Sequence, residues 1–119
     1  MSRMVLHLAL ASDWDAAQRD GEYRVSTLGR SLDDVGFIHA STSPEQVLGV
    51  ASAFYGNVWE PLVLLTIDVD RIGSDVRDEF VGDAPEPFPH IYGPIPVEAV
   101  IAVTGFGRGE DGTFVSLRA

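Results

Sequence analysis

The sequence contains no cysteine and no lysine, so all eight basic residues among its 119 are arginines. Without cysteine the protein has no disulfide, thiol nucleophile, iron–sulfur cluster or zinc finger. Without lysine it has no Schiff-base chemistry, no pyridoxal phosphate linkage and no phosphate-binding P-loop. Long apolar runs are missing as well, since none approaches the roughly 18 residues that a membrane span requires. We therefore expect no membrane partner.

Positive charge is scarce. Eighteen acidic residues against eight arginines give a formal net charge of −10 at pH 7. A chain this acidic repels the phosphate backbone, so we expect no nucleic-acid partner. The first apolar stretch is too short for the core of a signal peptide, and Asp13 and Asp15 follow it, which indicates a cytoplasmic protein. The length predicts a single domain over residues 1–119 with one proper core.

The hydrophobic pattern predicts more strands than helices. One helix is expected from Ser12 to Gly21, and a second from Ser43 to Gly56. In the second helix Ser43 is the predicted cap, Pro44 takes the first helical position, and Gln46 completes a capping box. The apolar spacing places Phe54 on its buried face. Residues 22–35 look irregular, 83–89 a loop and 107–112 a hairpin turn. Strands are expected at 4–10, 36–40, 62–69 (buried on both faces), 75–81 (an edge strand), 97–106 and 113–117. This order indicates a small α+β domain with mostly antiparallel sheets and two helices.

The three histidines, His7, His39 and His90, each lie in or beside an apolar segment that is typical of a strand. A buried imidazole requires hydrogen-bond partners, so three such positions point to a polar site inside the sheets. The alternative is that each histidine is separately satisfied and structural. Three imidazoles would suffice for a catalytic zinc ion, but no pair has a metal-like local spacing, so we predict no metal.

The segment 36–43 combines His39 with the hydroxyls of Ser41, Thr42 and Ser43 at the start of a predicted helix. A helix N-terminus carries a partial positive charge and binds anions such as phosphate or carboxylate. The alternative is ordinary: Ser43 caps the helix, its neighbours shape the turn, and His39 is packed in the core.

The segment 87–96 contains four prolines, which hold its side chains at low entropic cost. Such a segment could present His90 and Tyr92 to a ligand, with Gly93 allowing close approach of the backbone. Glu79, just before this segment, could act as a general base or stabilise a developing cation. The alternatives are a rigid surface turn and a solvated acid on an edge strand.

These segments, in this order, resemble a small bacterial family known as domain of unknown function 952. The resemblance rests on Val5-Leu6-His7, Trp14, residues 36–41 (GFIHAS) and residues 89–94 (PHIYGP), and it runs from about Val5 to Phe106. One departure lies before Glu79, where the family pattern suggests an aromatic residue and this chain has Asp78.

The family is in turn distantly similar to the ADP-ribosyltransferase superfamily. This similarity implies a split-sheet architecture with NAD, as a substrate rather than a cofactor, in a cleft between two small sheets. It places His7 at the first position of the site and His39, Ser41 and Thr42 at the second. Glu79, His90 and Tyr92 compete for the third. Arg24 or the helix start at Ser43 would hold the diphosphate, and Tyr92 or Phe88 would stack on the nicotinamide ring.

The resemblance therefore implies a domain that binds NAD or a related nucleotide and cleaves or transfers ADP-ribose. In that interpretation His39, His90 and Glu79 are catalytic, and the ligand is bound by His7, Ser41, Thr42, Tyr92 and Gly93. The alternative is a module without catalysis that uses the same cleft for a small ligand or a protein, as a toxin–antitoxin partner would. A third possibility is a structural protein whose histidines lie far apart in space.

Overall fold

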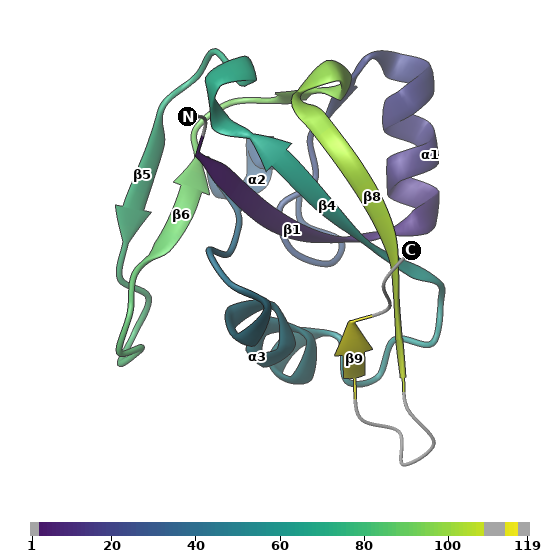
Figure 1. Cartoon of the computed structure of the whole chain (residues 1–119), viewed down its shortest axis with the longest axis vertical. Helices are drawn as coiled ribbons and strands as arrows, with labels where there is room; N and C mark the ends of the chain where they lie inside the picture. Colours follow the sequence, from purple (N-terminus) through teal and green to yellow (C-terminus); the bar gives the residue numbers. More distant parts are fainter. Residues whose placement is uncertain (1–2, 109–113, 117–119) are drawn as a thin grey trace.

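The computed structural model describes residues 3–108 and 114–116 (Figure 1). Three α-helices lie within them: α1 (Ala11–Asp20), α2 (Leu32–Val35) and α3 (Pro44–Phe54). The strands are β1 (Met4–Leu10), β2 (Glu22–Tyr23), β3 (Ile38–His39), β4 (Leu62–Asp68), β5 (Val76–Glu79), β6 (Phe88–Ile91), β7 (Ile95–Pro96), β8 (Val100–Arg108) and β9 (Phe114–Ser116). Most of the turn predicted at 107–112 lies outside the described residues.

Strand pairing is antiparallel throughout the described residues. One sheet has the order β1-β4-β8-β9, a second β3-β6-β5, and a third is the short pair β2-β7. The α+β class with antiparallel sheets is therefore confirmed. Each predicted strand overlaps an observed one, and β5 is the edge strand that was expected.

The helix count differs from the prediction, because α2 lies in the segment 22–35 that looked irregular. Ser31 Oγ accepts a hydrogen bond from the amide of Asp34, and the carboxylate of Asp34 accepts one from the amide of Ser31. This capping box, followed by Gly36 at φ +94°, holds a single helical turn. Four residues are too few to show a helical period in the sequence.

The helix α3 begins at the predicted cap, where Ser43 Oγ accepts from the amide of Gln46. The capping box was wrong, however, because the side chain of Gln46 accepts from the amide of Thr42 and donates to the carbonyl of Pro87. Gln46 thus ties the helix start to the proline-rich segment. Phe54 is 57% exposed rather than buried, since it lies at the last turn. The helix α1 begins at Ala11 without a side-chain cap, so Ser12 does not cap it.

In the four-stranded sheet, β1 and β4 pack against apolar clusters on both faces, whereas several residues of β8 are exposed. Val5, Leu65 and Ile67 belong to one apolar cluster, which includes residues of α1. Leu8 and Leu64, on the opposite face, belong to a second cluster with residues of α3. The strand β4 is thus covered on both sides, as its continuous apolar sequence predicted.

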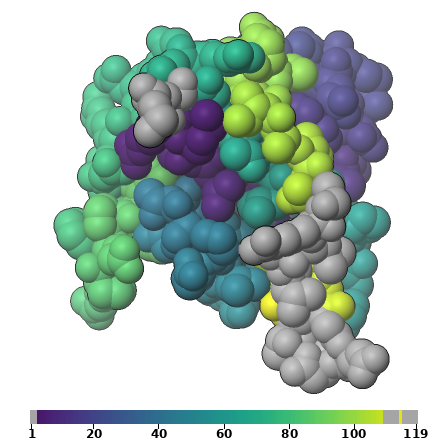
Figure 2. Space-filling view, in the orientation of Figure 1, coloured from purple at the N-terminus to yellow at the C-terminus, as the bar shows by residue number. Residues whose placement is uncertain are grey.

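The segment that follows α2 joins the two larger sheets. Its strand β3 pairs with β6, and two residues later Ser41 exchanges backbone hydrogen bonds with Leu6 of β1, at 2.7 and 2.8 Å. The turn between β5 and β6 protrudes at the lower left of the molecule (Figure 2). No helix in the described part of the chain is long and apolar enough to cross a membrane.

Candidate functional site

The three-stranded sheet carries apolar side chains on one face and polar and aromatic side chains on the other. Ile38 and Ile91, both fully buried, are paired and share the core face. His39 and His90 are the next pair and share the opposite face, because side chains alternate along a strand. The same alternation adds five further residues to that face: Phe37, Arg77, Glu79, Phe88 and Tyr92.

Glu79, His90 and His39 form a continuous hydrogen-bonded row across the three strands. Glu79 Oε1 lies 2.9 Å from His90 Nδ1, and His90 Nε2 lies 3.3 Å from His39 Nδ1. Glu79 Oε1 also accepts a hydrogen bond from the hydroxyl of Tyr92. The outer nitrogen of the row, His39 Nε2, is buried and has no hydrogen-bond partner among the described residues.

Aromatic rings hold this row in place. Phe37 stacks on His90 with ring centroids 4.0 Å apart, and the ring of Phe88 lies 4.8 Å from that of His39. The guanidinium of Arg77 lies over the ring of Tyr92, 4.5 Å from its centroid. Such contacts restrict the rotamers of the ionisable groups, which is what a preorganised site requires.

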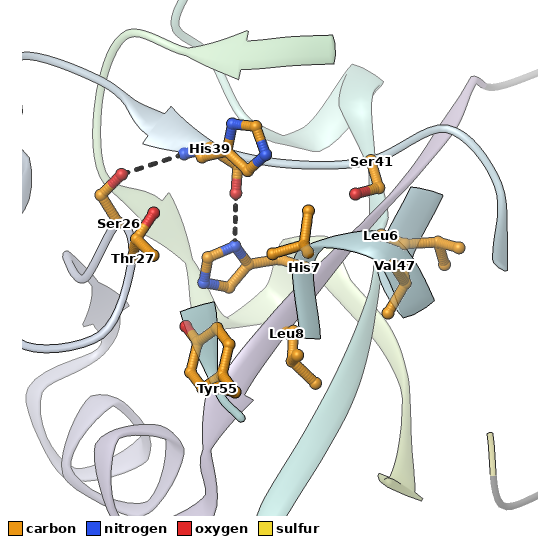
Figure 3. A pocket seen from close by; sticks show the side chains of 10 residues that line it. Leu6, His7, Leu8, Ser26, Thr27, His39, Ser41, Val47 and Tyr55 are labelled. Carbon is orange, nitrogen blue, oxygen red and sulfur yellow. Dashed lines mark hydrogen bonds between the residues drawn. The ribbon is translucent and has the colours of Figure 1, made fainter. Parts of the chain in front are cut away.

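His7 lies beside His39 (Figure 3), and both of its ring nitrogens have hydrogen-bond partners. Its Nδ1 lies 2.6 Å from the carbonyl oxygen of His39, which can only accept, so this nitrogen carries the proton. Its Nε2 then accepts from the hydroxyl of Tyr23 at 2.9 Å. Ser26 Oγ accepts from the amide of His39, so both backbone polar groups of His39 are fixed. A ligand could reach the His7 ring only by displacing one of its two bonds.

Burial sets the charge of the histidines. It lowers the pKa of His7 to about 4, against the opposing effect of the bond to the carbonyl of His39. The pKa of His39 is likewise lowered to about 4, chiefly by burial and to a lesser extent by the rings of His90 and His7. Hydrogen bonds from Tyr92 and His90 hold the pKa of Glu79 below its ordinary value. At neutral pH, His7 and His39 are therefore neutral and Glu79 is a carboxylate.

A cavity of about 450 Å³ adjoins the row and is lined in part by His39 and His90. Ser26, Thr27 and Arg30 supply its polar groups, and the rest of its lining is Leu28, Val35, Phe37, Phe54 and Val81. A separate, water-sized cavity of about 10 Å³ lies on the inner side, between His7, His39, Ser41 and Tyr55 (Figure 3). His39 borders both cavities.

The structure thus brings His39, His90, Glu79 and Tyr92 together and holds His7 against them. Of the large and the small cavity, Ser41 lines only the small one. The amide and the hydroxyl of Thr42 both donate hydrogen bonds to the side chain of Gln46. A Cβ on Gly93 would lie 2.6 Å from the side chain of Ser74, so packing alone requires glycine there. The contacts of Ser41, Thr42 and Gly93 with a ligand are not tested by this structure and stay predictions.

The arginine beside the cavity is not the expected one. Arg24 pairs with Glu22 and Asp33, at 2.9 Å each, and lines a different pocket. Arg30 lines the large cavity instead, and among the described residues it has no carboxylate partner. The hydroxyl of Ser43, the other expected phosphate contact, is occupied as a helix cap.

Sequence reasoning also missed Phe37, Ser26 and Arg30. Phe37 could have been found, because Phe37-Ile38-His39 and Phe88-Pro89-His90-Ile91-Tyr92 share one alternation of aromatic or histidine with apolar residues. Nothing local marks Ser26 or Arg30, which lie in an irregular segment and reach the site only through the fold. Within the described ranges, no group of three or more metal-ligating side chains could hold an ion.

The chain belongs to a recognised family. Residues 8–103 match the model of a family described as protein of unknown function, DUF952. The match includes β4, the three strands of the smaller sheet, the row of ionisable groups and the residues that line the large cavity, so the family assignment made from the sequence is confirmed. No protein with a curated description matches the chain.

Solved structures of one relative share the fold. An X-ray structure of protein CC0527 from Caulobacter crescentus is 26% identical, with 94% of this chain and 93% of that chain covered and a TM-score of 0.72. Its double mutant matches with the same identity and coverage and a TM-score of 0.71. The solution NMR structure is 27% identical, with 92% and 90% covered and a TM-score of 0.71. Neither the family nor these structures is described with an activity.

Proposed function

We propose that the protein binds a nicotinamide nucleotide, NAD or its ADP-ribose part, in the cavity lined by His39 and His90, and cleaves or transfers the ADP-ribose. The single observation that carries the proposal is the meeting of His39 and His90, 51 residues apart in the chain, at the wall of one cavity of about 450 Å³. Perturbed ionisable groups in a concave site are the usual mark of a binding or active site.

The lining of the cavity suits such a ligand. Small-molecule sites are mostly apolar, with a few convergent polar groups, and their volumes are roughly 300–1,000 Å³. Here Phe37 offers an aromatic surface beside His90, and Ser26 and Thr27 offer hydroxyls for a ribose or a carboxamide. The exposed guanidinium of Arg30 would hold a phosphate. NAD enters this proposal as a substrate and not as a resident cofactor.

The reaction follows from the chemistry of the bond. Cleavage of the nicotinamide–ribose bond passes through a state with positive charge on the sugar, as in glycoside hydrolysis. Neutral nicotinamide then leaves with the electron pair of the broken bond. The acceptor, water or another hydroxyl, must lose its proton, and His39 and His90 are the imidazoles beside the cavity whose ring nitrogens could accept it.

One feature favours binding without turnover. His39 Nε2 is covered by other protein atoms, and Glu79 Oε1 already accepts two hydrogen bonds. A ligand would reach the base only after a covering side chain moves; of the residues that line the cavity, Phe54 and Val81 are 57% and 45% exposed. A binding module with the same cavity is therefore the second candidate.

The test is a titration of the three histidines followed by NMR, with NAD, ADP-ribose and nicotinamide added in turn. We expect the resonances of His39 and His90 to shift together with one of these ligands, and those of His7 to shift less. If none of the three ligands moves His39 or His90, the nucleotide proposal is wrong. Binding without release of nicotinamide from NAD would leave the binding module as the function.

A pair of arginine variants sharpens the test. Arg30→Gln removes the charge at the cavity and should weaken the binding of ADP-ribose on the order of tenfold, because a charged hydrogen bond contributes about 1.5 kcal/mol or more. Arg24→Gln is the matched control, since Arg24 lies in the same segment but lines another pocket. Equal effects of the two variants would show that the phosphate contact has been placed wrongly.

A further inference from the structure

We propose that Glu79, His90 and His39 form a proton relay, in which His39 Nε2 is the base that removes a proton from a hydroxyl group or water in the cavity. This inference deepens the proposed function and takes its ligand from it. In this arrangement His39 is the catalytic residue, and His90 and Glu79 are positioning residues that act through it. Glu79, which the sequence suggested as a general base, is thereby placed at the far end of the relay.

The hydrogen bonds determine where each proton lies. Glu79 is ionised and can only accept, so the proton between it and His90 belongs to His90 Nδ1. In a neutral His90 ring, Nε2 is then an acceptor, and the proton between the two rings belongs to His39 Nδ1. A neutral His39 with its proton on Nδ1 has a bare lone pair on Nε2, the one ring nitrogen of the row without a partner among the described residues.

The row also explains how a buried histidine acts as a base. A positive charge confined to His39 is unfavourable, because burial holds its pKa at about 4. When Nε2 takes a proton from the attacking hydroxyl, Nδ1 passes its own proton to His90 Nε2, 3.3 Å away. The charge then rests on His90, 2.9 Å from the Glu79 carboxylate, and His39 is neutral again in its other tautomer.

The balance of the step is complete. The oxygen of water or of a hydroxyl forms a bond to the ribose carbon, the bond from that carbon to the nicotinamide nitrogen breaks, and its electron pair leaves with neutral nicotinamide. The proton of the attacking oxygen ends on His39 Nε2, and one proton moves from His39 to His90. The relay needs no oxidant, reductant or further reactant.

The surroundings favour charge on His90 over charge on His39. His7 lies on β1 against the backbone of His39 and is neutral, with a pKa of about 4. Tyr55, which borders the small cavity, is neutral too, since burial raises its pKa to about 12. The remaining charged or titratable groups that face the row are Arg30 at the cavity, Arg77 opposite His90, and Tyr92 on Glu79. Among the described residues, Glu79 is the carboxylate that is hydrogen-bonded to the row, through its bonds with His90 and Tyr92.

The relay is tested in the free protein by NMR of nitrogen-15-labelled histidine, with no ligand present. At neutral pH we expect His39 Nε2 to show the shift of an unprotonated ring nitrogen and His39 Nδ1 that of a protonated one. As the pH falls, His39 Nε2 and His90 Nε2 should become protonated in one shared step, because the added proton belongs to the pair. A proton on His39 Nε2 at neutral pH would overturn the relay.

Substitution of Glu79, at the far end of the row, provides the second measurement. Glu79→Gln keeps the size of the side chain and removes the charge, so the shared titration step should move to lower pH and His39 should lose its single tautomer. Glu79→Asp keeps the charge and should restore the step in part. Asp78→Asn is the matched control, because it removes the same charge one residue away on β5, where Asp78 pairs with Arg3.

The possible outcomes separate the relay from a general electrostatic effect and from the nucleotide proposal. If Asp78→Asn moves the step as far as Glu79→Gln does, the coupling is long-range and the relay is wrong. If the tautomers are as expected while NAD, ADP-ribose and nicotinamide leave His39 and His90 unmoved, the relay stands and the nucleotide proposal fails. If the ligands bind and the tautomer is the other one, the nucleotide proposal stands and the relay fails.

Discussion

The four-stranded sheet β1-β4-β8-β9 and the three-stranded sheet β3-β6-β5 use their faces differently. In the first, β1 and β4 pack apolar side chains on both faces, and Leu65 and Ile67 at its centre are fully buried. The second packs Ile38 and Ile91 on one face and turns two histidines and a carboxylate toward the other. Its strands are two to four residues long, against seven for β1 and for β4. The smaller sheet therefore depends on the larger one for its stability.

His7 and His39, which meet at the junction of these sheets, show the same difference. His7, on β1, has a partner for each ring nitrogen. His39, on β3, has one ring nitrogen bonded to another histidine and one without a partner among the described residues. His7 is 2% exposed and His39 is only half-buried, so burial and hydrogen-bond satisfaction both differ between them. The unsatisfied ring nitrogen of His39 is the feature on which the proposed relay depends.

The largest expected effect is in the four-stranded sheet. Leu65→Ala should lower the free energy of unfolding by about 3 to 5 kcal/mol, because it leaves a cavity at a fully buried position. Val103→Ala, directly opposite Leu65 on β8 but 41% exposed, is the control and should cost less than about 1 kcal/mol. Urea denaturation measures both. Similar losses for the two variants would show that β4 does not hold the core.

The second largest effect is expected from acid, which should lower the free energy of unfolding through one histidine in each of the two sheets. The pKa values of His7 and His39 fall from 6.5 to about 4 on folding, so the unfolded chain binds protons that the folded chain does not. Stability is then complete above pH 6.5 and is lost as the pH falls toward 4, by about 2 kcal/mol for each histidine at pH 5. Urea denaturation between pH 7 and 5 checks this before the carboxylates titrate. A constant free energy of unfolding over that range would contradict the prediction.

A smaller effect is expected from Tyr23→Phe, which removes the hydroxyl that donates to His7 Nε2. The buried nitrogen loses its partner, and the free energy of unfolding should fall by about 1 to 2 kcal/mol. The titration of His39 and His90 should stay in place, because the bond from His7 to the carbonyl of His39 remains. A large shift of that titration would mean that the satisfied histidine and the reactive one are not separable.

The smallest effect belongs to an ion pair that joins the two sheets. Arg3, just before β1, lies 2.6 Å from Asp78 on β5, and the two side chains are 40% and 48% exposed. Solvent screens such a pair, so Arg3→Ala should change the free energy of unfolding by less than about 1 kcal/mol. It should also leave the histidine titrations unchanged. A greater loss of stability would show that this contact, and not the strand pairing, holds the smaller sheet.

Sequence reasoning recovered the parts of the fold that carry a long pattern. The apolar runs of β1 and β4, the cap at Ser43 and the α+β class all follow from local sequence. The strands β2, β6 and β7 were missed, because runs of two to four residues show no period, and β6 and β7 also contain proline. The helix α2 was missed for the same reason, and it was the capping pair of Ser31 and Asp34 that could have revealed it.

The sequence named residues that the structure brings together, but it did not give their arrangement, and their role in a site stays a prediction. His39, His90, Glu79 and Tyr92 could be named because their residue types are chemically reactive and their neighbours are stiff. Their order in the row depends on the register of β3, β6 and β5, which pairs residues 51 apart and cannot be read from spacing. Arg30 and Ser26 reach the site only through tertiary packing, so their role depended on the structure.

The two backbone bonds between Leu6 and Ser41 have a consequence for hydrogen exchange. They join the segment 38–41 to β1, so the smaller sheet separates from the larger one only when both break. The amide protons of Leu6 and Ser41 therefore exchange with solvent when these two bonds, the seam between the sheets, open, even if the other strand pairs of each sheet stay closed. Their exchange rates measure how often the chain exposes the backbone beside His39, and a ligand that bridges the seam would slow both together.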